Sequence, residues 1–172
     1  NNSFTNLSSL GKFSDKEIIE IDIYKSDTDS KILKIFSNRA KPFVQDFRFI
    51  KGFEGGELKY YSEISKDKSK SKLIIDDFKV SKVPALAQLL SLASLQGIAD
   101  TLSGEGIRFD SFEMDFTSKD KIINITEALA LGPSISLLLD GYIKKNELVS
   151  LRGTLVPSTT INKIIKNIPL VG

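Results

Sequence analysis

The first regular pattern along the chain is an alternation of apolar and polar residues that follows a polar opening segment. Ile19, Ile21 and Ile23 alternate with two acidic residues and a tyrosine, and a polar turn separates them from a second apolar run over 32–36. A period of two is typical of a strand with one apolar face, so these runs predict a β-hairpin. Residues 1–14 show no sustained period, and we expect a loop or an edge segment there.

Further strands follow after a short helix. Apolar residues spaced by three and four over 42–49 predict this helix, with a proline near its first turn. Residues 58–64 and 73–80 predict two strands, which the lysine-rich run 66–72 joins. That run is either a solvated hairpin tip or a contact for anionic lipid, and the hairpin tip is the simpler interpretation.

The most apolar segment of the chain is 84–102. Its leucines and alanines form two adjoining helical stripes that cover most of the circumference, which predicts one long helix, buried or docked in a groove. The uncharged part, 83–99, is at the lower edge of the length that spans a bilayer and contains several polar residues. We therefore favour a buried helix over a membrane span.

A second block of strands, 106–156, again alternates apolar and polar residues. Its turns are too short for parallel crossovers, so we expect an antiparallel meander from Leu73 to Leu155 that one helix interrupts. The apolar parity changes near Asp110 and Ser111, which predicts a bulge or bend. Asn124, Ser136 and Arg152 should point away from a concave apolar side. The residues that we expect to line that side are Ile107, Phe109, Ile123, Ile125, Leu137, Leu139, Val149 and Leu151.

The chain closes on a predicted amphipathic helix after Pro157. Its apolar stripe holds Ile161, Ile164, Ile165 and Ile168, whereas Lys163 and Lys166 lie on the other side. This helix either packs on its own sheet or makes a membrane or cap contact through its lysines.

The elements together predict an α+β, mainly β fold. We expect a curved antiparallel meander that resembles a β-groove, with one long buried helix and two short helices. Residues 15–172 form a single domain in this prediction, with strand blocks at 17–80 and 106–156 on either side of helix 84–102. The C-terminal apolar run suggests a fragment of a longer chain.

Composition then removes most kinds of site chemistry. The chain has no cysteine, histidine or tryptophan, which excludes Ser-His-Asp triads, Cys-His dyads, disulfides and ordinary zinc sites. Lys and Arg number 24 against 22 Asp and Glu, a balance that does not favour a nucleic-acid partner. No phosphate-binding loop or dinucleotide fingerprint occurs. We expect no metal and no cofactor.

The carboxylates of Asp110, Glu113 and Asp115 are the remaining candidates for catalysis. They could form an acid/base set or a calcium cluster, but they alternate with Phe112, Met114 and Phe116 and lack EF-hand spacing. The solvated face of a strand explains them more simply.

An ordered series of short strings resembles the C-terminal region of bacterial AsmA-like proteins, which are grouped with the repeating β-groove, bridge-type lipid transporters. The series covers about residue 30 to the end. It consists of FEGGEL at 53–58, VPALAQLLSLASL at 83–95, SGEGIRF at 103–109, GPS at 132–134, GYI at 141–143, LRGTLVP at 151–157 and IPLVG at 168–172. Each string is short, and their order carries the resemblance.

The resemblance implies a function as well as a fold. Family members are anchored in the inner membrane and have a periplasmic β-rich body. For this chain, the resemblance implies an anchor in a segment outside this sequence. The implied partners are phospholipid and the inner membrane, with the outer membrane or an envelope partner protein as a further contact. The resemblance implies movement of phospholipid between the inner and outer membranes, and it implies no enzyme activity.

The residue pattern is compatible with this function and leaves two alternatives. Strands of about eight residues span roughly 26 Å, more than the ~15 Å half-thickness of a bilayer core, so a curved apolar face can hold an acyl chain. The same face is also the pattern of an ordinary core, which would make the protein a structural or docking module of an envelope-assembly protein. An enzyme acting on lipid or cell-wall substrates would need an exposed carboxylate pair in a cleft.

Overall fold

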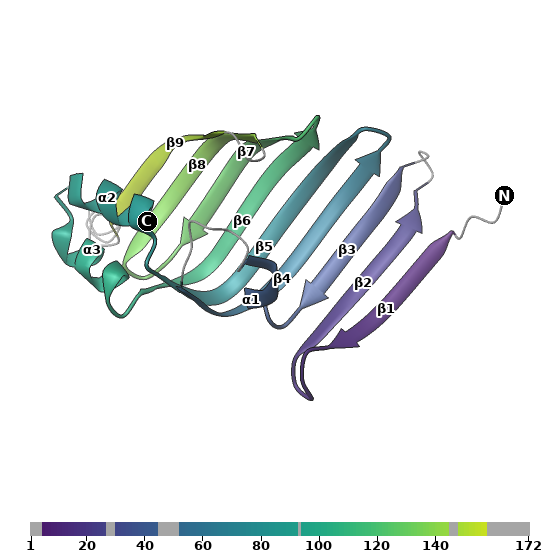
Figure 1. Cartoon of the computed structure of the whole chain (residues 1–172), viewed down its shortest axis with the longest axis horizontal. Helices are drawn as coiled ribbons and strands as arrows, with labels where there is room; N and C mark the ends of the chain where they lie inside the picture. The colour runs from purple at the N-terminus through teal and green to yellow at the C-terminus, as the bar shows by residue number, and fades with distance from the viewer. Residues whose placement is uncertain (1–4, 27–29, 45–51, 93, 145–147, 158–172) are drawn as a thin grey trace, which may run out of the picture.

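A computed structural model describes residues 5–26, 30–44, 52–92, 94–144 and 148–157 of the chain. Within these residues, nine strands form one antiparallel sheet in which each strand pairs with its neighbours in sequence (Figure 1). The strands are β1 (Asn6–Lys12), β2 (Ile18–Lys25), β3 (Lys31–Ser37), β4 (Gly52–Ser65), β5 (Lys68–Ser81), β6 (Ile107–Lys119), β7 (Ile122–Leu131), β8 (Ile135–Lys144) and β9 (Leu148–Pro157). The predicted antiparallel meander is therefore confirmed, and β1, which lies within the predicted loop or edge segment, is an edge strand.

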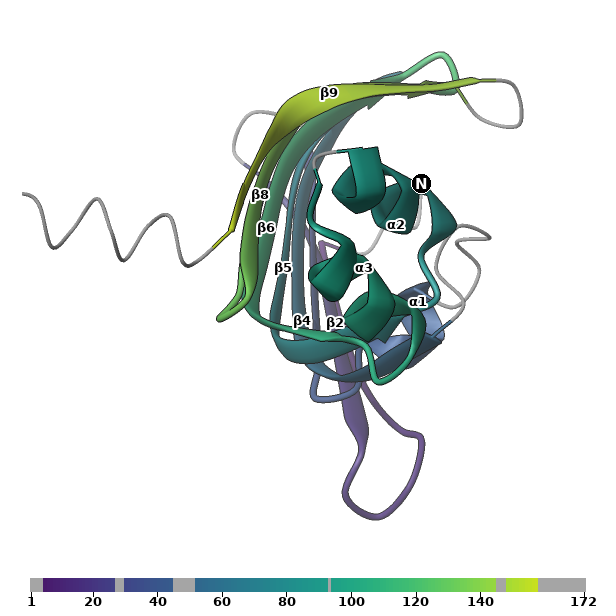
Figure 2. The ribbon, with the colours of Figure 1, turned by 90° about the vertical axis from the view of Figure 1, so that its left-hand side faces the viewer.

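The helices lie on one face of the sheet. They are α1 (Lys41–Val44), between β3 and β4, and α2 (Pro84–Leu92) and α3 (Gln96–Ser103), between β5 and β6. Figure 2 shows the sheet curving around α1, α2 and α3, so we call this side the concave face. The end of the sheet where α2 and α3 connect β5 to β6 is the helical end. The opposite end, with the hairpins β4–β5 and β6–β7, is the open end.

A bend crosses the three central strands near the helical end. Gly55, Gly56 and Asp77 have positive φ angles of 72°, 89° and 52°. Phe109 pairs with Phe78, yet the next partners are Ser111 and Asp76, so Asp77 and Asp110 fall outside the regular register. The bend that the parity change predicts near Asp110 and Ser111 is thus present.

The core lies between this bend and the helices. Phe78 stacks on Phe53 and Phe109 with ring centroids 5.3 and 5.4 Å apart, a row of three aromatic rings across β4, β5 and β6. Leu90 of α2 and Leu102 of α3 are fully buried in the same apolar cluster. Apolar contact between the helices and this end of the sheet therefore forms the core.

The prediction of one long buried helix over 84–102 is wrong. The chain forms two short helices, because Ser94 adopts a positive φ of 59° and ends the first. The amide of Leu95 donates to the carbonyl of Leu90 at 2.8 Å, and that of Ser94 donates to the carbonyl of Ser91 at 3.1 Å, which is a Schellman ending. The change in chain direction at Ser94 lets both α2 and α3 face the sheet. It leaves the Leu92 side chain 77% exposed.

The remaining short elements differ in detail from the expectation. Helix α1 ends at Val44, within the predicted 42–49, and 45–51 lie outside the described residues. The lysine run 66–72 is mostly part of strand β5, since only Lys66 and Asp67 form the turn between β4 and β5. The predicted C-terminal helix lies outside the described residues.

Truncation of a buried helix leucine should measure how much the helices stabilise the sheet. We expect Leu102→Ala to lower the free energy of unfolding by about 2–5 kcal/mol, since it leaves a cavity between α3 and the sheet. Leu92→Ala removes the same atoms from an exposed site and should change stability by less than about 0.5 kcal/mol. Urea unfolding of both variants checks this, and equal losses would show that the helices do not pack as described.

Candidate functional site

The concave face is built from rows of side chains that run across all nine strands. Residues directly opposite each other in paired strands share a face, so the register defines each row. The inner rung holds Gly11, Ile19, Ser37, Leu58, Ile75, Phe112, Ala130, Leu137 and Leu155. The middle rung holds Ser9, Ile21, Ile35, Tyr60, Leu73, Met114, Ala128, Leu139 and Gly153. The outer rung holds Leu7, Ile23, Leu33, Ser62, Ser71, Phe116, Ile125, Gly141 and Leu151.

The helices cover these rungs unequally. Leu58, Ile75 and Ala130 of the inner rung belong to the core cluster, and three more members of that rung pack against it. On the middle rung, Ile35, Tyr60 and Leu73 reach the cluster. Among the described residues, no outer-rung side chain belongs to the cluster or packs against it. The concave face is thus a core at the helical end and an apolar surface toward the open end.

The register places the predicted lining residues on this one face. Ile123 and Val149 lie beyond the outer rung, because both pair with Ile143. The opposite, convex face holds Asn124, Ser136 and Arg152, as predicted. The uncovered members of the predicted set are Ile123, Leu139, Val149 and Leu151. Val149 and Leu151 are exposed at 56% and 44%.

Other predicted lining residues lie in less accessible places. Ile107 and Phe109 are each 2% exposed beneath the helices, so they belong to the core and cannot line an open surface. Leu137 packs against the same cluster, and Ile125 is buried at 7% outside it. The sequence pattern identified their face correctly but could not show which part of that face the helices cover.

The predicted membrane or cap contacts fall outside the described residues. They are Ile161, Ile164, Ile165, Ile168, Lys163 and Lys166.

The sequence prediction missed the N-terminal half of the concave face. Ile19, Ile21 and Ile23 of β2 and Leu33 of β3 continue the rungs of the C-terminal block and are half-buried. Their alternation was visible in the sequence, but its alignment with the second block follows from the registers of β3–β4, β4–β5 and β5–β6. Nine strands spaced by about 4.8 Å make each rung roughly 38 Å long.

A chain of hydroxyl groups interrupts the apolar face at its centre. Ser71 Oγ donates to Ser62 Oγ at 2.9 Å and lies 3.1 Å from the Tyr60 hydroxyl. Ser62 and Ser71 are 1% and 2% exposed, and the Tyr60 and Phe116 rings lie close together, with centroids 6.4 Å apart. These short side chains fill the middle of the sheet without leaving buried polar atoms unpaired.

Removal of both serines should cost less than the two single removals added together. Ser71→Ala strands the buried Ser62 hydroxyl, and Ser62→Ala removes the acceptor of Ser71, so each should cost about 1–3 kcal/mol of unfolding free energy. The double variant should cost less than the sum of the two by about 1 kcal/mol or more, because neither serine hydroxyl is left buried without the other. Urea unfolding of the four proteins checks this, and additive costs would contradict the network.

The convex face carries charged side chains in cross-strand pairs. Lys72 Nζ lies 2.7 Å from Glu113 and 3.7 Å from Asp115, and the hydrogen bond with Glu113 raises the pKa of Lys72. Lys59 contacts Glu57 and Asp76 in the same way, and these contacts raise its pKa too. Glu113 and Asp115 therefore lie on the solvated face of a strand, the simpler of the two interpretations of their spacing.

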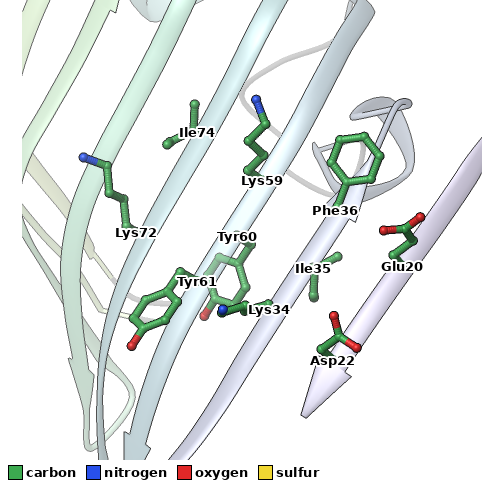
Figure 3. A pocket seen from close by; sticks show the side chains of 10 residues that line it. All are labelled: Glu20, Asp22, Lys34, Ile35, Phe36, Lys59, Tyr60, Tyr61, Lys72 and Ile74. Atoms are coloured by element: carbon green, nitrogen blue, oxygen red, sulfur yellow. The ribbon is translucent and has the colours of Figure 1, made fainter. Parts of the chain in front are cut away.

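A shallow depression of about 320 Å³ lies on the convex face over β2 to β5 (Figure 3). Lys34 lies over the Tyr24 ring at 5.4 Å, and hydrogen bonding to Tyr24 raises the pKa of this lysine. Glu20 and Asp22 line the depression together with lysines whose charges are already paired. The lining thus holds three lysines and two acidic residues, and because Lys59 and Lys72 already pair with carboxylates, it offers a ligand no strong excess of one charge.

Comparisons of the chain with protein-family models, curated proteins and solved structures find no match. Among the described residues, no three acidic side chains gather into a group that could hold a metal ion. In the same part of the chain, no helix has the length and apolar character needed to cross a bilayer. The resemblance to AsmA-like proteins stays a prediction from the strings quoted above.

Proposed function

We propose that this chain is a non-enzymatic lipid-handling domain that shields phospholipid acyl chains on its concave face. One observation carries the proposal: apolar side chains lie on the concave face beyond the helices on both sides of Ser62 and Ser71, and large side chains such as Leu151 and Val149 stay exposed there. Exposed apolar surface of this kind is characteristic of binding sites for apolar ligands.

Energetics favour such a surface as a carrier. Each acyl methylene exposed to water costs about 0.8 kcal/mol, so contact with apolar side chains along the path lowers the barrier to transfer. A rung of roughly 38 Å is longer than the ~15 Å half-thickness of a bilayer core, so one acyl chain fits along it. In the proposed role, the apolar side chains of the protein surround the acyl chain in place of the bilayer interior. No covalent bond is made or broken.

The cellular setting is a proposal that rests on the family resemblance. In it, the domain lies in the periplasm as part of an inner-membrane-anchored protein and helps phospholipid to pass between the inner and outer membranes. The partners would be phospholipid and the inner membrane, with the outer membrane or an envelope protein as a further contact.

A second candidate function is that of a structural or docking module without lipid. The observation that favours it is the cover of the inner rung by the helices, which makes the helical end an ordinary core. A protein partner would then occupy the outer rung.

A charge placed on the concave face should abolish lipid contact without unfolding the protein. We expect Leu151→Asp to lower phospholipid crosslinking from p-benzoylphenylalanine at Met114 by at least about tenfold, because an ion beside acyl chains costs more than ~1.4 kcal/mol. Its thermal midpoint should change little, since Leu151 is 44% exposed. Mass spectrometry of the adducts formed in a bacterial envelope is the measurement.

Leu138→Asp is the matched control. Leu138 is also 44% exposed but lies on the convex face, so this variant should keep its crosslinks. A probe at Glu113, the convex neighbour of Met114, should give no lipid adduct in any variant. Protein adducts without phospholipid at Met114 would instead support the docking module.

A further inference from the structure

The open end of the sheet carries a concentration of lysines on two neighbouring hairpin turns. We define the lysine tips as residues 66–68 and 119–121, which contain Lys66, Asp67, Lys68, Lys119, Asp120 and Lys121. All six side chains are exposed. Figure 1 shows the β4–β5 and β6–β7 hairpins together at the end of the sheet away from the helices. Four lysines against two aspartates give the tips a formal charge of +2, equal to that of the whole chain.

The arrangement of these charges is unfavourable for the isolated protein. Lys68 and Lys119 are direct cross-strand partners, a position in which like charges repel. One ion pair offsets this, between Lys119 Nζ and Asp67 at 3.3 Å, and it lowers the pKa of the Asp67 carboxyl. An external anion would relieve the remaining repulsion.

The turns also place these residues in uncommon backbone conformations. Lys66, Asp120 and Lys121 have positive φ angles of 43°, 50° and 65°. Two-residue hairpin turns favour Asn-Gly or Asp-Gly because glycine enters this region without strain. Lysine side chains therefore stand at turn positions where local preference alone favours glycine.

Apolar side chains of the concave face lie directly behind the tips. Ile64 precedes the first tip and is 37% exposed, and Ile123 follows the second. Register through Ser69 and Ser118 places these two isoleucines in one row on the concave side. The open end thus presents lysines at its edge and isoleucines just inside, the order of groups found at a lipid headgroup boundary.

We propose that the lysine tips dock the open end of the sheet on the surface of an anionic phospholipid bilayer. Lysine ammonium groups contact lipid phosphates, and Ile64 and Ile123 lie at the headgroup level. The tips contain no arginine and no aromatic residue, which disfavours nucleic acid, since phosphate forks and base stacking use those side chains. This docking proposal does not depend on whether the concave face binds lipid.

Vesicle binding tests the proposal. The full chain should bind vesicles of phosphatidylglycerol mixed with phosphatidylcholine, should not bind pure phosphatidylcholine, and should be released at about 0.5 M salt, where charges are screened. Each lysine near an anionic surface strengthens binding about fivefold. The triple variant Lys66→Gln, Lys68→Gln and Lys121→Gln should therefore lower the partition coefficient by at least about tenfold.

A matched variant has the same net charge with the tips intact. Lys16→Gln, Lys41→Gln and Lys82→Gln remove three exposed lysines at the other end of the sheet. This protein should bind nearly as well as the parent chain. Equal weakening by both triples would overturn the proposal in favour of a general charge effect, and so would the absence of binding to anionic vesicles or a preference for labelled DNA over them.

Single labels then report which end meets the bilayer. Because the chain has no cysteine, Ser118→Cys at the open end and Ser91→Cys on α2 can each carry one environment-sensitive dye. Emission should shift to shorter wavelength on vesicle binding only for the dye at Ser118→Cys. A shift only at Ser91→Cys would overturn the assignment. Loss of crosslinking at Met114 with intact vesicle binding would refute the lipid-carrying face alone, so the two proposals fail separately.

Discussion

The antiparallel pairing that links the nine strands of the described residues in sequence order is the constraint on which the rest of the structure depends. Because successive side chains alternate between faces, a slip of one residue at any strand pair would reverse every face beyond it. The irregular positions occur where the sequence itself changes parity. Two residues separate Phe109 from Phe112, and two separate Ile125 from Ala128, yet all four side chains stay on the concave side. These bends and bulges preserve one apolar face instead of interrupting it.

Partial cover of that face follows from the connections between strands. Short turns join the described strand pairs at the open end, whereas the long connection from β5 to β6 starts and finishes at the helical end. Its two helices can therefore cover only the rungs near that end. Leu90 and Leu102 are buried there, while outer-rung residues such as Phe116 and Leu33 stay outside the core cluster. The topology confines the helix-covered core to one end and leaves apolar surface at the other.

Local patterns predicted the strands well, since alternation in β2 or β8 reflects which face each residue occupies. The prediction of one long helix was wrong because the helix breaks at Ser94, which adopts a left-handed conformation. Glycine favours this conformation and would have indicated the break, whereas serine does not. Burial of Ile107 and Phe109 depends on where α2 and α3 dock, which no local period encodes. The alignment of Leu33 with Phe116 in one outer rung, with two serines between them, needs the pairing of distant strands, a property of register that a single sequence does not show.

The two ends of the sheet have opposite physical roles. At the helical end, stacked aromatic rings and buried leucines provide favourable contacts that ordinary packing explains. At the open end, Lys68 faces Lys119 and Lys66 adopts a left-handed conformation, features that destabilise an isolated domain. A protein tolerates such features where the rest of the fold supplies the stability, and they concentrate where surfaces meet ligands or partners. The lysines and the uncovered apolar side chains therefore lie at the same end of the molecule, the end at which we propose contact with lipid.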